Sequence, residues 1–259
     1  MSSRTSWRLF AVFSLVSMLV LAIGLYMGVR DILFPSAVGW KTDKSAGEEA
    51  SIPKENKIQI VALGDSLTRG TGDGSGLGYV GHLRARLAQV AGQEVYVLNH
   101  GVNGYKTADL LRDLQKKEDI RRTIRQADII TLSIGGNDLF NAGAEEVRPE
   151  ESQKRLPGAV DRYRQIVKII TSLNPKAKVL YVGLYNAFAD LSNARESYKI
   201  VQLWNGEASA VLYQYPNTIF VPTDDLFRTG GVKYLSSDHF HPNQAGYRRI
   251  GERMAEVVR

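Results

Sequence analysis

Five short apolar runs alternate with helix-like segments along most of the chain, and this alternation limits the fold more than any other feature. The runs are rich in β-branched residues and span residues 58–63, 94–98, 128–134, 178–184 and 218–221. The intervening segments repeat apolar residues every three or four positions, as a helix does, over residues 79–90, 107–126, 160–173, 198–213 and 243–258. This order predicts an α/β fold, in which helices cover both faces of a five-stranded parallel sheet in three layers.

An apolar run near the N-terminus is long enough to cross a membrane. Leu9 to Val29 holds about 21 residues without a charge, close to the ~20 that a helix needs to span a bilayer. Arg4 and Arg8 precede the run, whereas Arg30 is offset at once by Asp31. The positive-inside rule therefore places the N-terminus in the cytoplasm and the rest of the chain outside the membrane.

This anchor divides the chain into four expected parts: a cytoplasmic N-terminus (1–8), a transmembrane anchor (9–29), an extracytoplasmic tether (30–57) and a folded domain (58–259). The tether is polar and lacks helical or strand periodicity. A cleaved signal peptide, which would release a secreted protein, is the alternative. Such a peptide usually has a shorter apolar core, and only a poor cleavage site follows the run here, at Pro35-Ser-Ala-Val38.

The composition excludes several kinds of site. The chain has no cysteine, and therefore no disulfide, thiol nucleophile, cysteine-based zinc site or lipid-modified cysteine. Its net charge is +6, but Lys and Arg are dispersed among acidic residues, so a nucleic-acid partner is not indicated. The glycine-rich stretch 69–78 lacks the Lys-Ser/Thr and the glycine spacing of a phosphate-binding loop, and we expect a flexible loop there.

The first apolar run stops abruptly at a Gly-Asp-Ser sequence. Gly64 permits a tight turn, which places Ser66 at the carboxyl edge of the predicted sheet and at the start of the next helix. Ligands of open α/β sheets bind at this edge, and a helix N-terminus adds backbone N–H groups and a positive dipole end. Ser66 is therefore a candidate nucleophile; the alternative is an ordinary helix N-cap.

Polar residues in three further segments can complete a site for acyl transfer. A serine nucleophile needs a base within hydrogen-bond reach and a third group that orients the base. Asp238 and His241 can supply both, because their three-residue spacing brings them to one side of a turn. The developing oxyanion needs hydrogen-bond donors, which the backbone N–H groups of Gly104 and Ser66 and the side-chain amide of Asn137 can provide. The three segments are Asn99–Gly104, Gly135–Asp138 and Asp238–Asn243.

Together with Ser66, these segments resemble the GDSL or SGNH hydrolase family, which carries a serine, a glycine, an asparagine and a histidine in four separate blocks. The resemblance covers about residues 58–259 and implies a flavodoxin-like, three-layer fold. It also implies a lipase- or esterase-type acylhydrolase that cleaves carboxylic esters and needs no cofactor. On this resemblance Ser66, Asp238 and His241 are catalytic, and Ser66, Gly104 and Asn137 form the oxyanion hole.

Other assignments of single residues stay open. Gly101 is a second candidate for the glycine donor, although the family pattern favours Gly104. Tyr105-Lys106 stands where the family commonly has a shorter acidic step, which affects substrate fit rather than the donor. His239 could join Asp238 and His241 in a metal site, but no further cluster with ligand spacing accompanies it. We expect no metal, and we interpret His82 and His100 as structural.

Two classes of function are compatible with these residues. The first is a membrane-tethered, extracytoplasmic ester hydrolase, with a polysaccharide O-acetylesterase as a variant on the same fold. The second is a surface binding module that holds an acylated or glycan ligand without turnover. A metal-dependent phosphoesterase is a third. The irregular segment 185–196, which contains Phe188, could line an acyl pocket, but acyl length, alcohol group and oligomeric state are not readable from the sequence.

Overall fold

The computed structural model describes residues 7, 13–26, 57–140, 148–189, 194–228 and 231–258. The chain divides into two compact units, Met1–Pro53 and Lys54–Arg259. In the first unit a helix is described over residues 13–26, and its large apolar side chains are exposed. No helix in the described part of the chain is both long enough and apolar enough to cross a membrane. Residues 9–12 and 27–29 of the expected anchor and residues 30–56 of the expected tether lie outside the described residues, and both the anchor and the tether stay predictions.

The second unit contains a parallel sheet of five strands, as the sequence predicts. The spatial order is β2-β1-β3-β4-β5, and every neighbouring pair is parallel. The strand order therefore reverses at β1, which lies between β2 and β3. The strands are β1 (Lys57–Gly64), β2 (Glu94–Gly101), β3 (Ile129–Ser133), β4 (Lys178–Val182) and β5 (Thr218–Val221).

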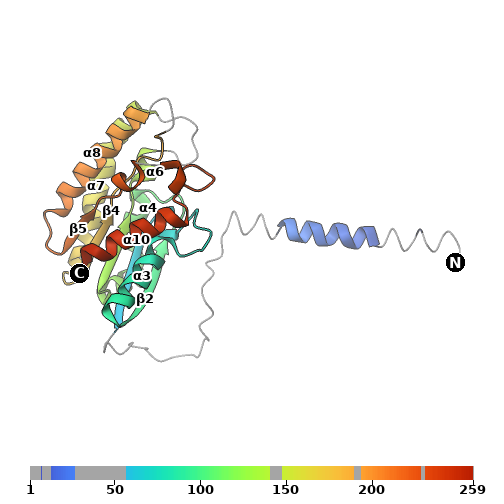
Figure 1. Cartoon of the computed structure of the whole chain (residues 1–259), viewed down its shortest axis with the longest axis horizontal. Coiled ribbons are helices and arrows are strands. Elements are labelled where there is room, and N and C mark those ends of the chain that lie inside the picture. The colour runs from blue at the N-terminus through green and yellow to red at the C-terminus, as the bar shows by residue number, and fades with distance from the viewer. Residues whose placement is uncertain are drawn as a thin grey trace. The chain divides into compact units, whose positions relative to one another are not determined.

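Helices cover both faces of the sheet, which confirms the three-layer arrangement. Helices α3 (Gly78–Ala91) and α10 (Gln244–Val258) lie side by side on one face (Figure 1). The other face is covered by α4 (Thr107–Lys116), α5 (Glu118–Gln126), α7 (Pro149–Leu173) and α8 (Ala194–Leu212). Four short helices lie in the connections: α2 (Ser66–Arg69), α6 (Gly136–Leu139), α9 (Asp224–Arg228) and the 3₁₀ helix η1 (Gly231–Tyr234).

The two faces of β1 supply two separate hydrophobic cores. Val61 and Leu63 belong to the cluster beneath α4, α5, α7 and α8, whereas Ile60 and Ala62 belong to the cluster beneath α3 and α10. All four side chains are fully buried. A strand that is buried on both faces reads as a continuous apolar run, because successive side chains point to opposite faces. This burial explains the unbroken pattern in the sequence.

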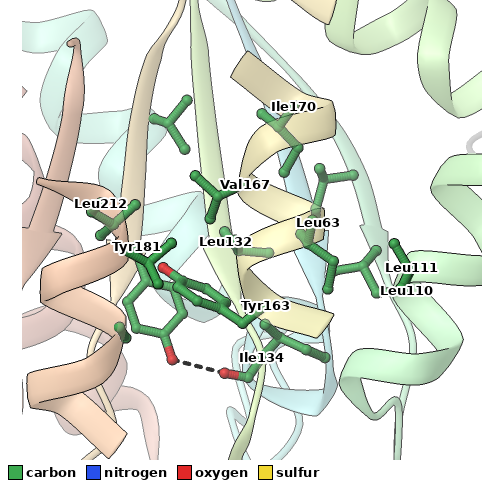
Figure 2. Packing of buried hydrophobic residues seen from close by; sticks show 14 of the residues in the cluster. Leu63, Leu110, Leu111, Leu132, Ile134, Tyr163, Val167, Ile170, Tyr181 and Leu212 are labelled. Carbon is green, nitrogen blue, oxygen red and sulfur yellow. Dashed lines mark hydrogen bonds between the residues drawn. The ribbon is translucent and has the colours of Figure 1, made fainter. Parts of the chain in front are cut away.

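Aromatic side chains close the larger core around α7. The rings of Tyr163 on α7 and Tyr181 on β4 lie 5.0 Å apart in an edge-on arrangement. The Tyr181 hydroxyl donates to the Ile134 carbonyl oxygen at 2.7 Å, at the end of β3 (Figure 2). The indole N–H of Trp204 donates to the same Tyr181 hydroxyl at 2.7 Å. The core therefore fixes the backbone immediately before α6, which carries Asn137.

The segment 107–126 was expected to form one helix, and this expectation was wrong. It forms α4 and α5, separated at Lys117, whose backbone is extended (φ −98°, ψ 104°). Glu118 and Asp119 follow the break, where acidic side chains favour a helix N-terminus. The bend lets both helices bury their apolar faces, which include Leu114 and Ile124.

Helix α7 begins at Pro149 rather than at residue 160, where the predicted helix-like segment starts, and Pro157 lies inside the helix. Pro149 is compatible with a first helical turn, which has no partner for the missing N–H. Tertiary hydrogen bonds hold the first turns of α7 against α6: the Ser152 hydroxyl and the Arg155 guanidinium both donate to the Leu139 carbonyl oxygen, at 2.7 and 2.8 Å. These contacts outweigh the local signal of the prolines.

Two further boundaries differ from the prediction. Strand β2 runs to Gly101 rather than residue 98, because His100 and Gly101 continue the ladder opposite Leu63 and Gly64. Between the last predicted strand and the last predicted helix, the structure adds α9 and η1, which are not among the helix-like segments of the sequence. Helix α9 forms because it buries two apolar side chains, Leu226 and Phe227, in the core beneath α10.

Candidate active site

The predicted site residues follow neighbouring strands at the carboxyl edge of the sheet. Ser66 comes directly after β1, Gly104 after β2 and Asn137 after β3. These three strands are adjacent, and the chain order reverses among them. Ligands of doubly wound sheets bind at such a reversal, because the connections on its two sides separate and leave a crevice.

Local geometry requires the Gly-Asp-Ser sequence that ends β1. Gly64 has φ +143°, and a Cβ atom there would lie 2.0 Å from the Ser133 carbonyl oxygen, so no larger residue fits. Asp65 caps α2, with its Oδ1 accepting a hydrogen bond from the Leu67 N–H at 3.0 Å. Ser66 is the first residue of α2 and is 7% exposed. The N-cap is therefore Asp65, and Ser66 is left for another role.

Ser66, His241 and Asp238 form one hydrogen-bonded line. His241 Nε2 lies 2.8 Å from Ser66 Oγ, although the residues are 175 positions apart, and His241 Nδ1 lies 2.6 Å from Asp238 Oδ2. The other carboxylate oxygen of Asp238 accepts from the Ser236 hydroxyl at 2.6 Å and from the N–H groups of Phe240 and His241, both at 2.9 Å. The structure thus brings together the three residues predicted for the nucleophile, base and orienting acid.

These hydrogen bonds keep the Asp238 carboxylate ionised. Partial burial raises the pKa of Asp238, but the hydrogen bonds from Ser236, His241 and the two backbone N–H groups outweigh burial and hold the pKa well below its usual value of 3.8. An ionised carboxylate on Nδ1 selects the tautomer that leaves Nε2 free to accept a proton from Ser66 Oγ.

Asn137 lies on α6, is 5% exposed and faces the same site. Its side-chain amide donates to the Tyr105 carbonyl oxygen at 3.0 Å, which ties α6 to the turn after β2. The next residue, Asp138, accepts from the N–H and the hydroxyl of Thr107 at 2.8 and 2.6 Å, and from Arg162 at 3.1 Å. Helix α6, which carries Asn137, is therefore held by hydrogen bonds to the turn after β2, to α4 and to α7.

The two candidate glycines have different surroundings. A Cβ atom on Gly101 would lie 2.5 Å from the Arg69 backbone nitrogen, so close packing of β2 against α2 explains that glycine. Gly104 is exposed, has φ +76° and would leave a Cβ atom without contacts. It does not line the cavity beside Ser66. The structure thus places Gly104 in the turn next to Asn137, and its role as a donor stays a prediction.

The remaining histidines lie apart from the hydrogen-bonded line. His239 is exposed and has a left-handed backbone (φ 54°). His100 Nε2 lies 3.2 Å from Thr123 Oγ1, and His82 is on α3. Among the described residues, no group of three or more His, Asp or Glu side chains is arranged to hold a metal ion.

A buried polar network beneath Ser66 was not predicted. Ser133 Oγ donates to Asp65 Oδ1 at 2.8 Å, and Thr68 Oγ1 lies 2.7 Å from both Ser133 Oγ and the Tyr79 hydroxyl. Burial raises the pKa of Asp65 from 3.8 to about 6, although the hydrogen bonds from Ser133 and Leu67 and the nearby His241 oppose this rise. The sequence predicts only a turn at Asp65, because the residues next to it in the chain do not indicate that its side chain is buried.

A cavity opens beside Ser66 and the ring of His241. It contains about 480 Å³ of empty space, including its open mouth. Asn137 and Asp65 also face it, and the rest of the lining is mostly apolar: Leu67, Gly136, Phe140, Leu184, Tyr185, Ala187, Phe188 and Phe240. The expected pocket residue Phe188 is thus part of the wall.

Several known proteins are similar to this chain in sequence. The model of the GDSL-like lipase/acylhydrolase family matches residues 62–249. YpmR, an uncharacterised protein of Bacillus subtilis, is 31% identical over 236 residues, which cover 88% of this chain and 92% of YpmR. The spore germination lipase LipC of Bacillus licheniformis is 28% identical over 210 residues, which cover 76% of this chain and 94% of LipC.

Solved structures of esterases and lipases have the same fold. A lipase from a goat rumen metagenome superposes with a TM-score of 0.69 at 24% identity and covers 77% of this chain and 97% of its own. A family 3 carbohydrate esterase of Clostridium thermocellum has a TM-score of 0.57 at 18% identity and covers 77% and 94%. At these identities the likeness concerns the fold alone. Because the family model matches most of the chain, the protein belongs to the GDSL-like lipase/acylhydrolase family and is a carboxylic ester hydrolase.

Proposed function

We propose that the protein hydrolyses carboxylic esters through a Ser66–His241–Asp238 triad. The proposal rests on two hydrogen bonds. Ser66 Oγ lies 2.8 Å from His241 Nε2, and His241 Nδ1 lies 2.6 Å from Asp238 Oδ2. A serine hydroxyl becomes a competent nucleophile when a positioned base removes its proton as the new bond forms. The ionised Asp238 would stabilise the imidazolium that results.

The reaction would proceed in two balanced steps. In the first, Ser66 Oγ attacks the ester carbonyl carbon and its proton passes to His241 Nε2; the C–O bond to the alcohol then breaks, and the same proton passes to the leaving oxygen. In the second, water attacks the acyl-enzyme and gives a proton to His241, the bond to Ser66 Oγ breaks, and that proton returns to Oγ. The products are one alcohol and one carboxylic acid.

Negative charge on the carbonyl oxygen would be stabilised by the side-chain amide of Asn137 and the backbone N–H groups of Ser66 and Gly104. The 5% exposure of Asn137 supports this assignment, because a donor shielded from water acts more strongly on developing charge. Its amide donates to the Tyr105 carbonyl oxygen. The amide nitrogen carries two hydrogens, and we infer that one keeps this contact while the other faces the substrate.

We further propose that residues 9–29 anchor the protein in a membrane with the hydrolase domain outside the cytoplasm. The proposal rests on the uncharged apolar run and on Arg4 and Arg8 before it. Protease added to intact cells should remove the hydrolase domain. Full protection of the domain, or recovery of soluble protein that begins after Val29, would contradict a retained anchor.

Hydrolysis of p-nitrophenyl butyrate by the full chain tests the proposed chemistry. The wild type should turn over this ester, and Ser66→Ala should retain the fold but lose more than ~10⁴-fold in kcat. Wild-type protein that binds acylated or glycan ligands without turnover would favour the non-catalytic binding module. Equal activity in the wild type and Ser66→Ala would remove Ser66 from the reaction.

A further inference from the structure

The lining of the cavity beside Ser66 combines two kinds of residue. Ser66, His241 and Asn137 line it together with mostly apolar residues, three of which are phenylalanines. The ring centroids of Phe140 and Phe188 lie 5.0 Å apart, and those of Phe188 and Phe240 lie 5.7 Å apart. Phe188 therefore joins the other two rings into one apolar surface.

We propose that this cavity binds the acyl chain of the ester, that it favours a short chain, and that Phe188 sets the length limit. The inference rests on the ester hydrolysis proposed above and adds the class of acyl group. It assigns the alcohol part of the ester to the solvent side of His241, where the leaving oxygen must receive its proton.

Two other polar side chains line the cavity, and both make hydrogen bonds within the protein. The Tyr185 hydroxyl donates to the Phe240 carbonyl oxygen at 2.8 Å, and Asp65 Oδ1 accepts from Leu67 and Ser133. Apart from these two and the residues of the proposed reaction the lining is apolar, so a sugar ring would leave most of its hydroxyl groups without partners, which costs more than ~1 kcal/mol for each buried group. An alkyl chain loses no hydrogen bond on entry and gains from burial of its methylene groups.

Phe188 limits the space that a chain can occupy. Its ring packs against both Phe140 and Phe240, so the three rings form one continuous wall. Replacement of this ring by a methyl group would join the volume of the removed side chain to the cavity. A longer acyl chain would then fit than the wild-type wall allows.

Phe188 is the wall residue that a substitution can remove with the least damage to the fold. Phe140 is 6% exposed and belongs to the larger core, so its truncation would open a cavity there. Phe240 precedes His241 and contacts its ring edge-on at 5.0 Å, so its loss would disturb the proposed base. Phe188 is partly buried in the connection after β4. Its ring contacts Phe140 and Phe240 but not the His241 ring, and it makes no hydrogen bond to Ser66 Oγ.

The test compares p-nitrophenyl acetate, butyrate, octanoate and palmitate as substrates of the full chain. In the wild type, kcat/KM should be highest for butyrate and at least ~10-fold lower for octanoate, because a chain longer than the pocket meets the Phe188 ring and cannot bring its carbonyl carbon to Ser66 Oγ. Phe188→Ala should raise the octanoate-to-butyrate ratio at least ~10-fold. Phe220→Ala is the matched control: Phe220 is also a partly buried phenylalanine but lies on β5 outside the cavity wall, and its removal should leave the ratio unchanged.

Two results would overturn the inference even when Ser66-dependent hydrolysis is present. One is a wild-type kcat/KM that is highest for acetate or palmitate; the other is an octanoate-to-butyrate ratio that does not change in Phe188→Ala. Labelling by p-nitrophenyl alkylphosphonates, followed by intact mass, separates this failure from failure of the proposed function. Faster labelling by the butyl than by the octyl reagent, reversed in Phe188→Ala, supports the pocket even if no ester is hydrolysed. Absence of both labelling and hydrolysis overturns pocket and function together.

Discussion

Asp65→Asn should stabilise the protein at neutral pH, and this gain in stability should disappear as the pH falls to about 4. The folded-state pKa of Asp65 is raised to about 6 from 3.8, first because burial disfavours its charge. A raised folded-state pKa means that the folded protein binds the proton more tightly than the unfolded chain. The stability from this group is therefore fully present below pH ~3.8 and is lost as the pH rises through ~6.

The size of the effect follows from that shift. A change of about two pKa units, at ~1.4 kcal/mol per unit, corresponds to ~3 kcal/mol of unfolding free energy lost by the wild type between pH 4 and pH 7. Asparagine has no charge to bury, and its Oδ1 can accept the same two hydrogen bonds, from Leu67 and Ser133, that Asp65 Oδ1 accepts. The gain in the variant should therefore grow from near zero at pH 4 to ~3 kcal/mol at pH 7.

Urea unfolding followed by circular dichroism, at half-unit steps from pH 4 to pH 7, measures this difference directly. Asp238 does not interfere, because its lowered pKa makes its contribution fall only below pH ~3.8. Asp65→Ala is the control: it also removes the charge, but it leaves the Leu67 N–H uncapped and should be ~1–2 kcal/mol less stable than Asp65→Asn. Parallel stability curves for the wild type and Asp65→Asn over this range would refute the reasoning.

Four further substitutions test the site and its support. His241→Ala should lower kcat by ~10⁴ or more, whereas His239→Ala should change kcat little; equal losses restored by added zinc would indicate a metal site instead. Asn137→Ala should lower kcat by ~10²–10³ with KM nearly unchanged, and a lowered melting temperature with normal kcat per folded enzyme would remove Asn137 from the oxyanion hole. Gly135→Ala should cost ~2–4 kcal/mol in urea unfolding, because its Cβ would lie 2.1 Å from the buried Trp204 ring at φ +113°; wild-type stability would contradict this packing.

The elements that the sequence predicted well are those with local causes. Strand β1 reads as an apolar run because it is buried on both faces, and its Gly-Asp-Ser ending marks the turn, since only glycine fits at Gly64. Asp238 and His241 could be paired from their spacing, because a turn of three residues brings their side chains together. Each of these features leaves a pattern within a few consecutive residues, so it can be predicted from neighbouring residues.

Features that depend on distant partners needed the tertiary structure. Ser66 meets His241 across 175 positions only because α10 packs on the face of the sheet next to α3. The helix through Pro157 forms because α6 offers a carbonyl oxygen to Ser152 and Arg155, which a local reading of the prolines cannot reveal. Here long-range hydrogen bonds outweigh local propensity.

The chemistry of the site divides in the same way. The residue types that acyl transfer needs, Ser66, Asn137 and His241, are visible in the sequence because each ends a strand or precedes a helix. The raised pKa of Asp65 and the packing of Phe140 and Phe240 against Phe188 are not visible, because desolvation and cavity shape arise only when segments from β1, β3, β4 and the last loop are packed together. Residue identity thus determined the reaction class, whereas packing decided which carboxylate is buried and what size of acyl group fits.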